Sequence, residues 1–410
     1  MAQSVDTETY ILDGRTYTLH TITLPASECS EEATISCLLE PALISLLPNP
    51  VPPAHKPITN PNFCVLQTEH KGAGLFAARD IAAGELIMVE HPALILPTGR
   101  FPAAVYDELA RRLPAKRRAE LLAMANARSE EECPSPVEGI VRTNALMLEL
   151  DPKGTISQEK REIYGGVYPT VNRANHSCGP NATVKWDLST LTETLYALRP
   201  IVAGEEIQKT YINPIFSREK RMSILLNNYR FSCDCPWCNI RSRAQPCANV
   251  DLPLTEEEQA LVNASDKDRA LLGTWIFTHP GYNKWSTDLS RKDDVIINSH
   301  MEALALLDKE GMHGLQNLFI EEIAMCYAML GDLDAFKMWG ERVVQLSRIE
   351  DPSVARKFEE WLVEPTKLMK KWAWRKRQRE QAPGKRKLKT GHAVPVDVVD
   401  GFDSFFNDTD

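Results

Sequence analysis

The chain has 410 residues, of which 43% are hydrophobic and 25% charged, and its formal net charge is −9. This composition is that of an ordinary globular protein and excludes disordered and fibrous classes, while the length predicts at least two domains. No apolar run approaches the roughly 18 residues that a membrane-spanning helix needs. The N-terminus also lacks a basic region followed by an apolar block, so we expect an intracellular protein without membrane contact.

The N-terminal 60 residues mix short apolar runs with a cluster of prolines. We interpret residues 1–60 as a leader that wraps on or near the first domain. Beyond it, β-rich segments predict strands over residues 63–67, 72–78 and 85–89. Residues 101–127, rich in Ala, Leu, Arg and Lys, then predict a helical insertion.

A second helix is predicted over about residues 135–150, so the insertion covers about residues 100–150. Three short strands are expected next, at residues 182–186, 192–198 and 206–212, because turn-compatible residues separate them. A helix over residues 217–228 follows.

The remainder of the chain has an almost unbroken helical periodicity. Thr255 and Glu258 have the spacing of a capping box, and Asp351-Pro352 is typical of a helix start. Segments at 294–309, 314–330 and 333–348 are similar to tetratricopeptide helix pairs. We therefore predict an all-helical C-terminal domain over residues 250–380, followed by a flexible tail over residues 381–410.

Basic residues concentrate near the C-terminus: residues 366–390 contain eleven Lys or Arg and one acidic residue, Glu380. Such a block is compatible with a nuclear-import signal or a nucleic-acid contact. It is equally compatible with a solvated helix end. The expected location is accordingly the nucleus, the cytoplasm or both.

Ten cysteines in a chain of this length, three of them at Cys233, Cys235 and Cys238, fit metal ligation in a reducing compartment better than a disulfide framework. Zinc takes four ligands in a tetrahedron, so a fourth must come from elsewhere. Cys178 is the natural donor, and Cys247 is its main competitor. The scattered remainder are interpreted as small apolar side chains: Cys29, Cys37, Cys64, Cys133 and Cys326.

Four motifs occur in an order that resembles SET-domain lysine methyltransferases, and the SET-and-MYND branch in particular. They are Lys71-Gly72-Ala73-Gly74-Leu75, Asn175-His176-Ser177-Cys178-Gly179-Pro180-Asn181, Gly204-Glu205-Glu206-Ile207 with Tyr211, and Tyr229-Arg230-Phe231-Ser232-Cys233-Asp234-Cys235. The resemblance covers about residues 61–240. It implies an α+β fold: a β-rich SET domain with a helical insertion, a post-SET zinc site, and then the all-α, tetratricopeptide-like domain.

The resemblance also implies S-adenosyl-L-methionine as cofactor and Zn2+ as metal, together with a set of site residues. Cys178, Cys233, Cys235 and Cys238 would bind the zinc. Cofactor contacts would come from Lys71, Gly72, Ala73, Asn144, Asn175 and His176, and from Phe231, which would line the lysine channel or stack near the adenine. Tyr211 and Tyr229 would be the catalytic residues: Tyr211 would lie at the transferred methyl group, and Tyr229 would line the same channel or stack near the adenine.

The chemistry of these residue types supports the assignment. An in-line methyl transfer from sulfonium to amine needs alignment and a neutral nucleophile more than a strong acid or base. A narrow apolar channel lowers the pKa of the entering lysine, and aromatic faces favour the cationic sulfonium. The Tyr211 hydroxyl can hold the amine in line, whereas a phenol with a reference pKa of about 10 is a poor base.

The sequence departs from the closest branch in two places. Between Val89 and Asn144 there is a single cysteine, Cys133, so a Cys/His-rich MYND finger is not expected there. Lys209 also makes the segment before Tyr211 more basic than in many relatives, which could alter substrate preference.

The predicted function is protein-lysine N-methyltransferase activity on a histone or another protein. An alternative from the binding class is an inactive SET scaffold that docks a partner peptide on its helical domain. A nucleic-acid module is a weaker alternative, because the three clustered cysteines lack paired histidines and a docking helix. The target lysine and the number of methyl groups added do not follow from the sequence.

Overall fold

A computed structural model describes residues 9–12, 14–27, 30–56, 60–69, 71–155, 163–243, 253–371 and 373–381. The chain divides into two compact units. The β unit comprises residues 1–175, 182–209 and 228–230, and the helical unit comprises residues 176–181, 210–227 and 231–410. Among the described residues, no helix combines the length and the apolar character that crossing a membrane would require.

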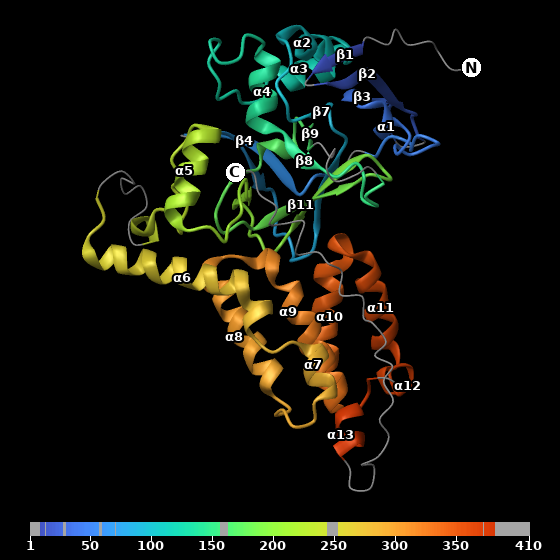
Figure 1. Cartoon of the computed structure of the whole chain (residues 1–410), viewed down its shortest axis with the longest axis vertical. Coiled ribbons are helices and arrows are strands. Elements are labelled where there is room, and N and C mark those ends of the chain that lie inside the picture. The colour runs from blue at the N-terminus through green and yellow to red at the C-terminus, as the bar shows by residue number, and fades with distance from the viewer. Residues whose placement is uncertain are drawn as a thin grey trace. The chain divides into compact units, whose positions relative to one another are not determined.

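The strands of the described residues form three sheets (Figure 1). The largest has the order β1 (Thr9–Leu12), β2 (Arg15–Leu24), β3 (Ala33–Leu39), β7 (Leu94–Pro97), β9 (Tyr164–Val167) and β8 (Leu146–Leu148). The second has the order β10 (Asn175–His176), β13 (Glu206–Lys209), β5 (Gly72–Ala77) and β4 (Phe63–Thr68). The third consists of β11 (Ala182–Asp187), β12 (Thr192–Ala197) and β6 (Leu86–Glu90).

The six-stranded sheet is buried on both faces because its apolar side chains alternate between two cores. Along β7, Leu94 and Leu96 join a core with the insertion helices, whereas Ile95 joins the core shared with the two smaller sheets. The insertion helices are α2 (Ala103–Arg111), α3 (Ala115–Leu122) and α4 (Pro136–Asn144). One sheet therefore separates the helical insertion from the strands that carry the predicted cofactor motifs.

Residues 1–60 were expected to form a leader, but much of this segment belongs to the sheet itself. β2 pairs antiparallel with β3 along its length, and β3 pairs parallel with β7. A short helix, α1 (Pro41–Ile44), follows. The prolines obscured the alternating β-branched pattern of residues 15–24, and strand pairing with a segment over 50 residues away leaves no local signal.

The insertion is helical, as predicted, but its elements are shorter than expected. Pro114 separates α2 from α3, since proline cannot continue a helix. The helix predicted over 135–150 ends at Asn144, and the chain then extends into β8. Ser135 caps α4 by accepting from the backbone N–H groups of Val137 and Glu138. β13 likewise ends at Lys209, so Tyr211 lies in the loop beyond the strand.

The helical unit consists mainly of a series of helices, and the helical C-terminal region is thereby confirmed. Its first helix is α5 (Arg218–Tyr229), of which residues up to 227 belong to this unit. The helices that follow are α6 (Glu256–Thr278), α7 (Tyr282–Thr287), α8 (Val295–Glu310), α9 (Asn317–Leu330), α10 (Leu333–Glu350), α11 (Pro352–Val363), α12 (Pro365–Leu368) and α13 (Lys376–Gln381). Trp275, Leu307 and Phe319 lie in the core shared by α6, α8 and α9.

Two helix starts in this unit are formed as predicted. The Thr255 hydroxyl accepts from the Glu258 backbone N–H at 3.2 Å, and the Glu258 carboxylate accepts from the Thr255 N–H at 2.8 Å, which completes the capping box. Asp351 caps α11 with Pro352 at its first position.

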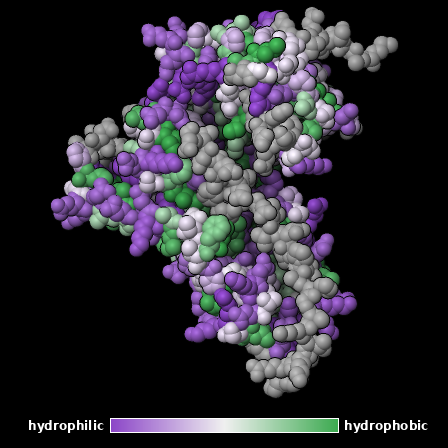
Figure 2. Space-filling model, viewed as in Figure 1, coloured by the Kyte–Doolittle hydropathy of each residue, from purple (hydrophilic) through white to green (hydrophobic). Residues whose placement is uncertain are grey.

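The basic block is partly structural. Arg377 is fully buried: it pairs with Asp293 at 2.9 Å and lies over the Trp285 ring at 4.3 Å. It is therefore withdrawn from any import receptor or phosphate in the folded protein. Other surface positions are mixed in character, and Figure 2 shows mainly hydrophilic side chains with apolar ones among them on the displayed face. Four basic residues of the block, Lys385, Arg386, Lys387 and Lys389, and the expected tail from residue 382 lie outside the described residues.

Candidate active site and metal centre

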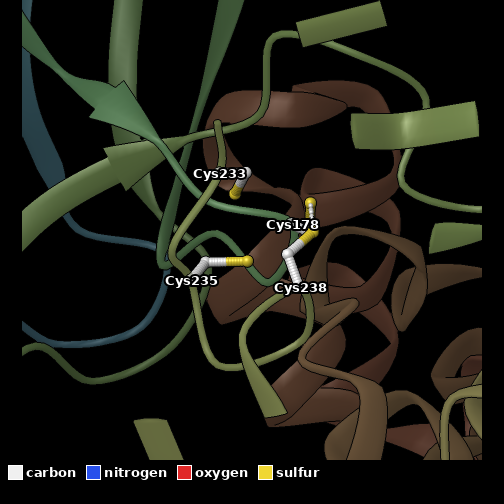
Figure 3. A group of neighbouring side chains, drawn as sticks. All are labelled: Cys178, Cys233, Cys235 and Cys238. Carbon is white, nitrogen blue, oxygen red and sulfur yellow. Dashed lines mark hydrogen bonds between the residues drawn. The ribbon is translucent and has the colours of Figure 1, made fainter. Parts of the chain in front are cut away.

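Four buried cysteines converge in the helical unit (Figure 3). Cys178 follows β10, and Cys233, Cys235 and Cys238 come from the loop after α5. Their sulfurs all lie within 4.8 Å of one another, and Cys178 and Cys238 are 3.4 Å apart. Tetrahedral zinc with bonds of about 2.3 Å places its sulfurs about 3.8 Å apart. The cluster therefore has the donor type, number and spacing to hold a zinc ion. Cys247, the competing donor, lies outside the described residues.

The loop that carries three of these cysteines is closed by its own backbone and by Trp237. The Cys235 carbonyl accepts from the N–H groups of Cys238 and Asn239, at 2.9 and 2.8 Å. The Trp237 ring lies where a Cβ on Gly179 would be, at 2.2 Å, and its Nε1 donates to the Lys309 carbonyl at 3.2 Å. Glycine at 179 is thus required by close packing rather than by an unusual backbone angle.

The four thiols shift one another's pKa values in opposite directions. Hydrogen bonding with Cys178 raises the pKa of Cys233, whereas hydrogen bonding with Cys178 lowers the pKa of Cys238. Such opposed shifts arise because four buried sulfurs cannot all become anions next to one another. A divalent cation would remove that conflict, since it stabilises every thiolate at once.

The ring nitrogens of His176 contact the Cys178 sulfur and the backbone N–H of Tyr211. Its Nδ1 accepts from the Tyr211 N–H at 3.0 Å, which assigns the ring proton to Nε2. Nε2 lies 3.3 Å from the Cys178 sulfur and can donate to it. Both ring nitrogens of this buried histidine are engaged, so a cofactor contact from residue 176 is left to its main chain.

Tyr211 and Phe231 form an aromatic group with His176. The ring centroids of His176 and Tyr211 are 5.3 Å apart, those of His176 and Phe231 are 6.1 Å apart, and those of Tyr211 and Phe231 are 6.5 Å apart. Tyr211 and Phe231 are each half-buried. Within the helical unit, the predicted catalytic phenol is therefore held beside the predicted metal ligands by one histidine.

Asn175 belongs to the β unit, where Glu206 fixes its side chain. The Asn175 amide donates to the Glu206 carboxylate at 2.8 Å. A Cβ on Gly74 would lie 2.9 Å from that carboxylate and 3.0 Å from the amide, so the second glycine of the Gly-x-Gly turn makes room for the pair. This contact links three of the motifs that the sequence suggested.

Lys71, Gly72 and Ala73 lie at the turn into β5. Thr68 holds the turn, because its hydroxyl donates to the Gly72 carbonyl at 2.7 Å and accepts from the Lys71 N–H at 2.9 Å. Gly72 has a φ of +70°, which glycine adopts without strain. Lys71 and Gly72 are exposed, and Ala73 is half-buried.

Asn144 and Tyr229 also lie in the β unit. The Asn144 amide donates to the carbonyls of Ala125 and Ile140, at 2.7 and 2.8 Å. Its side-chain N–H groups therefore hold the C-terminal end of α4 in place. Burial raises the pKa of Tyr229, which is half-buried at the end of α5. Asn144 thus has a structural role that the sequence did not suggest.

Lys209 was expected to bring a charge near the lysine channel, but it is buried. Burial lowers the pKa of Lys209 to about 8, and the charge of Glu193 acts against that shift. Burial also raises the pKa of Glu193 to about 7. Lys209 is therefore an interior partner of Glu193.

The predicted residues fall into two groups. His176, Tyr211, Phe231 and the four cysteines belong to the helical unit; Lys71, Gly72, Ala73, Asn144, Asn175 and Tyr229 belong to the β unit. The sequence did not indicate the positioning roles of Glu206, which lies inside a quoted motif, or of Trp237, which lies between Cys235 and Cys238.

Comparison with known proteins identifies the central segment. The model of the SET domain family matches residues 72–212. The chain is 29% identical over 180 residues to histone-lysine N-methyltransferase set5 of Schizosaccharomyces pombe, covering 44% of this chain and 51% of that protein. It is 30% identical over 179 residues to histone-lysine N-methyltransferase SMYD3 of Mus musculus, covering 42% and 38%.

N-lysine methyltransferase SMYD2-A of Danio rerio is 25% identical over 201 residues, covering 48% of this chain and 44% of that protein. The chain thus spans about half or less of the length of these relatives. The solved methyltransferase domain of human SETMAR is 20% identical over 36% of this chain and 44% of that chain, and its TM-score of 0.21 carries no structural argument. Residues 72–212 match the SET domain family, and the chain is similar over part of its length to lysine methyltransferases named set5, SMYD3 and SMYD2-A.

Proposed function

We propose that this protein is a protein-lysine N-methyltransferase that uses S-adenosyl-L-methionine. One observation carries the proposal: the SET segment supplies Cys178 to the cysteine cluster and, in the same loop system, holds Tyr211 through His176. Relatives named as lysine methyltransferases match 44% and 42% of this chain. The substrate class is a lysine side chain of a histone or another protein.

In this proposal the residues of the chain orient the cofactor and the substrate amine, and they do not transfer protons. When bound, the cofactor supplies a sulfonium methyl group. The Gly72 turn and Asn175, held by Glu206, would border it, with Lys71 and Ala73 beside the turn. The Tyr211 hydroxyl would hold the substrate amine in line, which accelerates transfer by alignment. Phe231 and Tyr229 would keep the lysine channel apolar and so favour the neutral amine.

Zinc is proposed at Cys178, Cys233, Cys235 and Cys238. Four protein ligands leave no open position, which is typical of a structural rather than a catalytic site. Its part in the function would be to fix the loop around Tyr211 and Phe231. The helix pairs of the C-terminal region, including α9 with α10, support the finer proposal of a tetratricopeptide-like domain that offers a surface for a partner peptide.

The proposal is tested by incubating the full chain with methyl-labelled cofactor and candidate proteins that contain lysine. Transfer of label to lysine by wild type, and its loss in Tyr211→Phe, supports the enzyme. Cofactor binding without transfer to any protein would instead identify an inactive scaffold and refute the proposal.

A further inference from the structure

Arg221 is a fully buried cation beside the cysteine cluster. It lies on α5, and its guanidinium donates to the carbonyls of Phe216 and Trp237, the latter at 3.3 Å. Its Nη2 is 4.0 Å from the Cys238 sulfur. Trp237 directly precedes Cys238, so Arg221 contacts both the backbone of the metal loop and one of its sulfurs.

Arg221 has no carboxylate within hydrogen-bond distance among the described residues. Its nearest one, on Asp266, is 3.8 Å away and half-buried, and it already accepts from the Arg218 N–H at 2.7 Å. Nε of Arg221 is buried without a hydrogen-bond partner. Burying a cation without a close counter-charge is strongly unfavourable. The 3.8 Å ion pair with Asp266 therefore offsets the charge of Arg221 only in part, and further negative charge nearby would stabilise it.

Two other arginines are fully buried in the described part of the chain, and each has its own carboxylate. Arg269 donates to the Glu310 carboxylate at 2.9 Å, and Arg377 donates to the Asp293 carboxylate at 2.9 Å. Both also donate to several backbone carbonyls. Arg221 differs from them in that its carboxylate partner lies farther away, at 3.8 Å, and the Cys238 sulfur lies almost as near, at 4.0 Å.

We propose that Arg221 is the fixed counter-charge of the metal centre, where it stabilises the bound zinc by offsetting the negative charge of the thiolates. This inference rests on the zinc site proposed above. Zinc with four thiolates leaves a net charge of about −2. The Arg221 guanidinium offsets part of it, and the same group holds the Trp237 carbonyl so that Cys238 faces the ion. Arg221 is a positioning residue for the metal and does not act in methyl transfer.

The arrangement also explains why α5 begins beside the metal loop. Arg218, one turn before Arg221, donates to the Cys238 carbonyl at 2.6 Å. Two arginines from the first turns of one helix thus hold the same residue of the loop. Partners outside the ligand shell change metal affinity by about 10–100-fold when they are removed.

The test measures zinc affinity of the full chain by competition with a chromophoric chelator. Arg221→Gln removes the charge and keeps most of the volume, and we expect it to weaken zinc binding about 10–100-fold. Arg377→Gln is the matched control: it removes a buried arginine of the same unit and leaves zinc affinity unchanged. Asp266→Asn is also expected to leave it unchanged. In the cobalt-substituted protein, the thiolate-to-cobalt absorption band shifts in Arg221→Gln and not in Arg377→Gln.

An Arg221→Gln protein that binds zinc within about threefold of wild type, with an unshifted cobalt band, overturns the inference. If this variant does not fold, Arg221→Met decides, because it also removes the charge but leaves no buried polar amide to satisfy. A loss of zinc affinity greater than about threefold then supports the inference, and a smaller loss overturns it. Wild-type protein that binds no zinc refutes the zinc site itself, whereas absent methyl transfer with normal zinc binding refutes only the proposed activity.

Discussion

Tyr211 is the residue on which the proposed chemistry depends. Its backbone is held by the Nδ1 of His176, and its ring lies with those of His176 and Phe231. The hydroxyl is thereby placed by groups that also contact the metal loop. This arrangement separates two roles that mutation can distinguish, since the ring packs and the hydroxyl orients.

Tyr211→Phe removes the hydroxyl and keeps the ring. We expect the rate of methyl transfer to fall about 100-fold or more, because a positioned polar group typically contributes on that scale. Cofactor affinity, measured by calorimetry, and zinc content should remain those of wild type. Equal losses in cofactor affinity and rate would show that the phenol serves binding instead of orientation.

His91 gives the β unit a dependence on pH. Its Nε2 accepts from the His55 N–H and its Nδ1 faces the Leu191 carbonyl, each at 2.8 Å. Burial lowers the pKa of His91, and the charges of His55 and Arg117 act in the same direction. A histidine with a depressed pKa contributes stability that is present above its ordinary value of 6.5 and is lost as pH falls toward its folded value.

His91→Gln removes this titration. We expect the difference in unfolding free energy between wild type and His91→Gln to be constant above about pH 7 and to shrink as pH falls below 6.5. Chemical denaturation at a series of pH values measures it. A difference that stays constant down to pH 5 would show that His91 has the same pKa in the folded and the unfolded chain.

At the scale of elements, the metal loop and the Asn-His-Ser-Cys segment are joined by close packing. The Trp237 ring lies against both Gly179 and Gly311, and a Cβ on either would come within 2.2 Å of it. Interiors pack too densely to absorb such an overlap without movement. The two glycines therefore leave the space that the Trp237 ring occupies and so fix the position of the cysteine loop.

Gly179→Ala should destabilise the protein by about 1–3 kcal/mol, because the new methyl group overlaps the indole. Trp237→Phe should partly rescue it, since the smaller ring vacates the overlapping positions. The check is a double-mutant cycle of unfolding free energies. Strictly additive losses of unfolding free energy would mean that the backbone of the loop moves away, and that overlap with the indole does not cause the destabilisation by Gly179→Ala.

Sequence reasoning succeeded for elements whose signals are local. The strands β4, β5 and β6 and the capping box of α6 follow from adjacent residues, and they are found within a residue or two of their predicted positions. It failed for β1 to β3, which join the main sheet only through the pairing of β3 with the distant β7. The early end of α4 depends on β8 pairing with β9, which is also non-local.

The site was predictable to the level of residue types but not of contacts. The cysteine spacing indicated which thiols meet, because zinc chemistry limits the choice. The sequence did not show that the two ring nitrogens of His176 contact Tyr211 and Cys178, or that Lys209 is buried beside Glu193. Those outcomes depend on how strands and loops pack, and a buried arginine such as Arg221 carries no sequence signal at all.

At the scale of the whole molecule, the cysteine cluster joins segments that are about 55 residues apart in the chain, from the SET segment to the loop after α5. Closing such a loop with a metal stabilises the folded state, because binding energy at a site absent from the unfolded chain is folding energy. The zinc site is thus expected to govern the stability of the helical unit.

Removal of zinc should lower the thermal stability of the full chain. Zinc at about 100 times its Kd stabilises by about 2.7 kcal/mol, so chelation reverses a shift of that order. Cys233→Ser should melt like the chelated protein and show no further response to chelator. Cys64→Ser is the control, since Cys64 is an exposed free thiol away from the cluster. A chelator effect that persists in Cys233→Ser would place the metal elsewhere.

The central claim is that this chain methylates lysine in proteins, and peptide mass spectrometry tests it most directly. Histones and total cell protein are incubated with the zinc-loaded chain and cofactor, then digested and searched for methylated lysine. We predict one or more lysines that gain methyl groups with wild type and do not with Tyr211→Phe. Zinc-loaded, cofactor-binding wild type that adds no methyl group to any lysine would contradict the account.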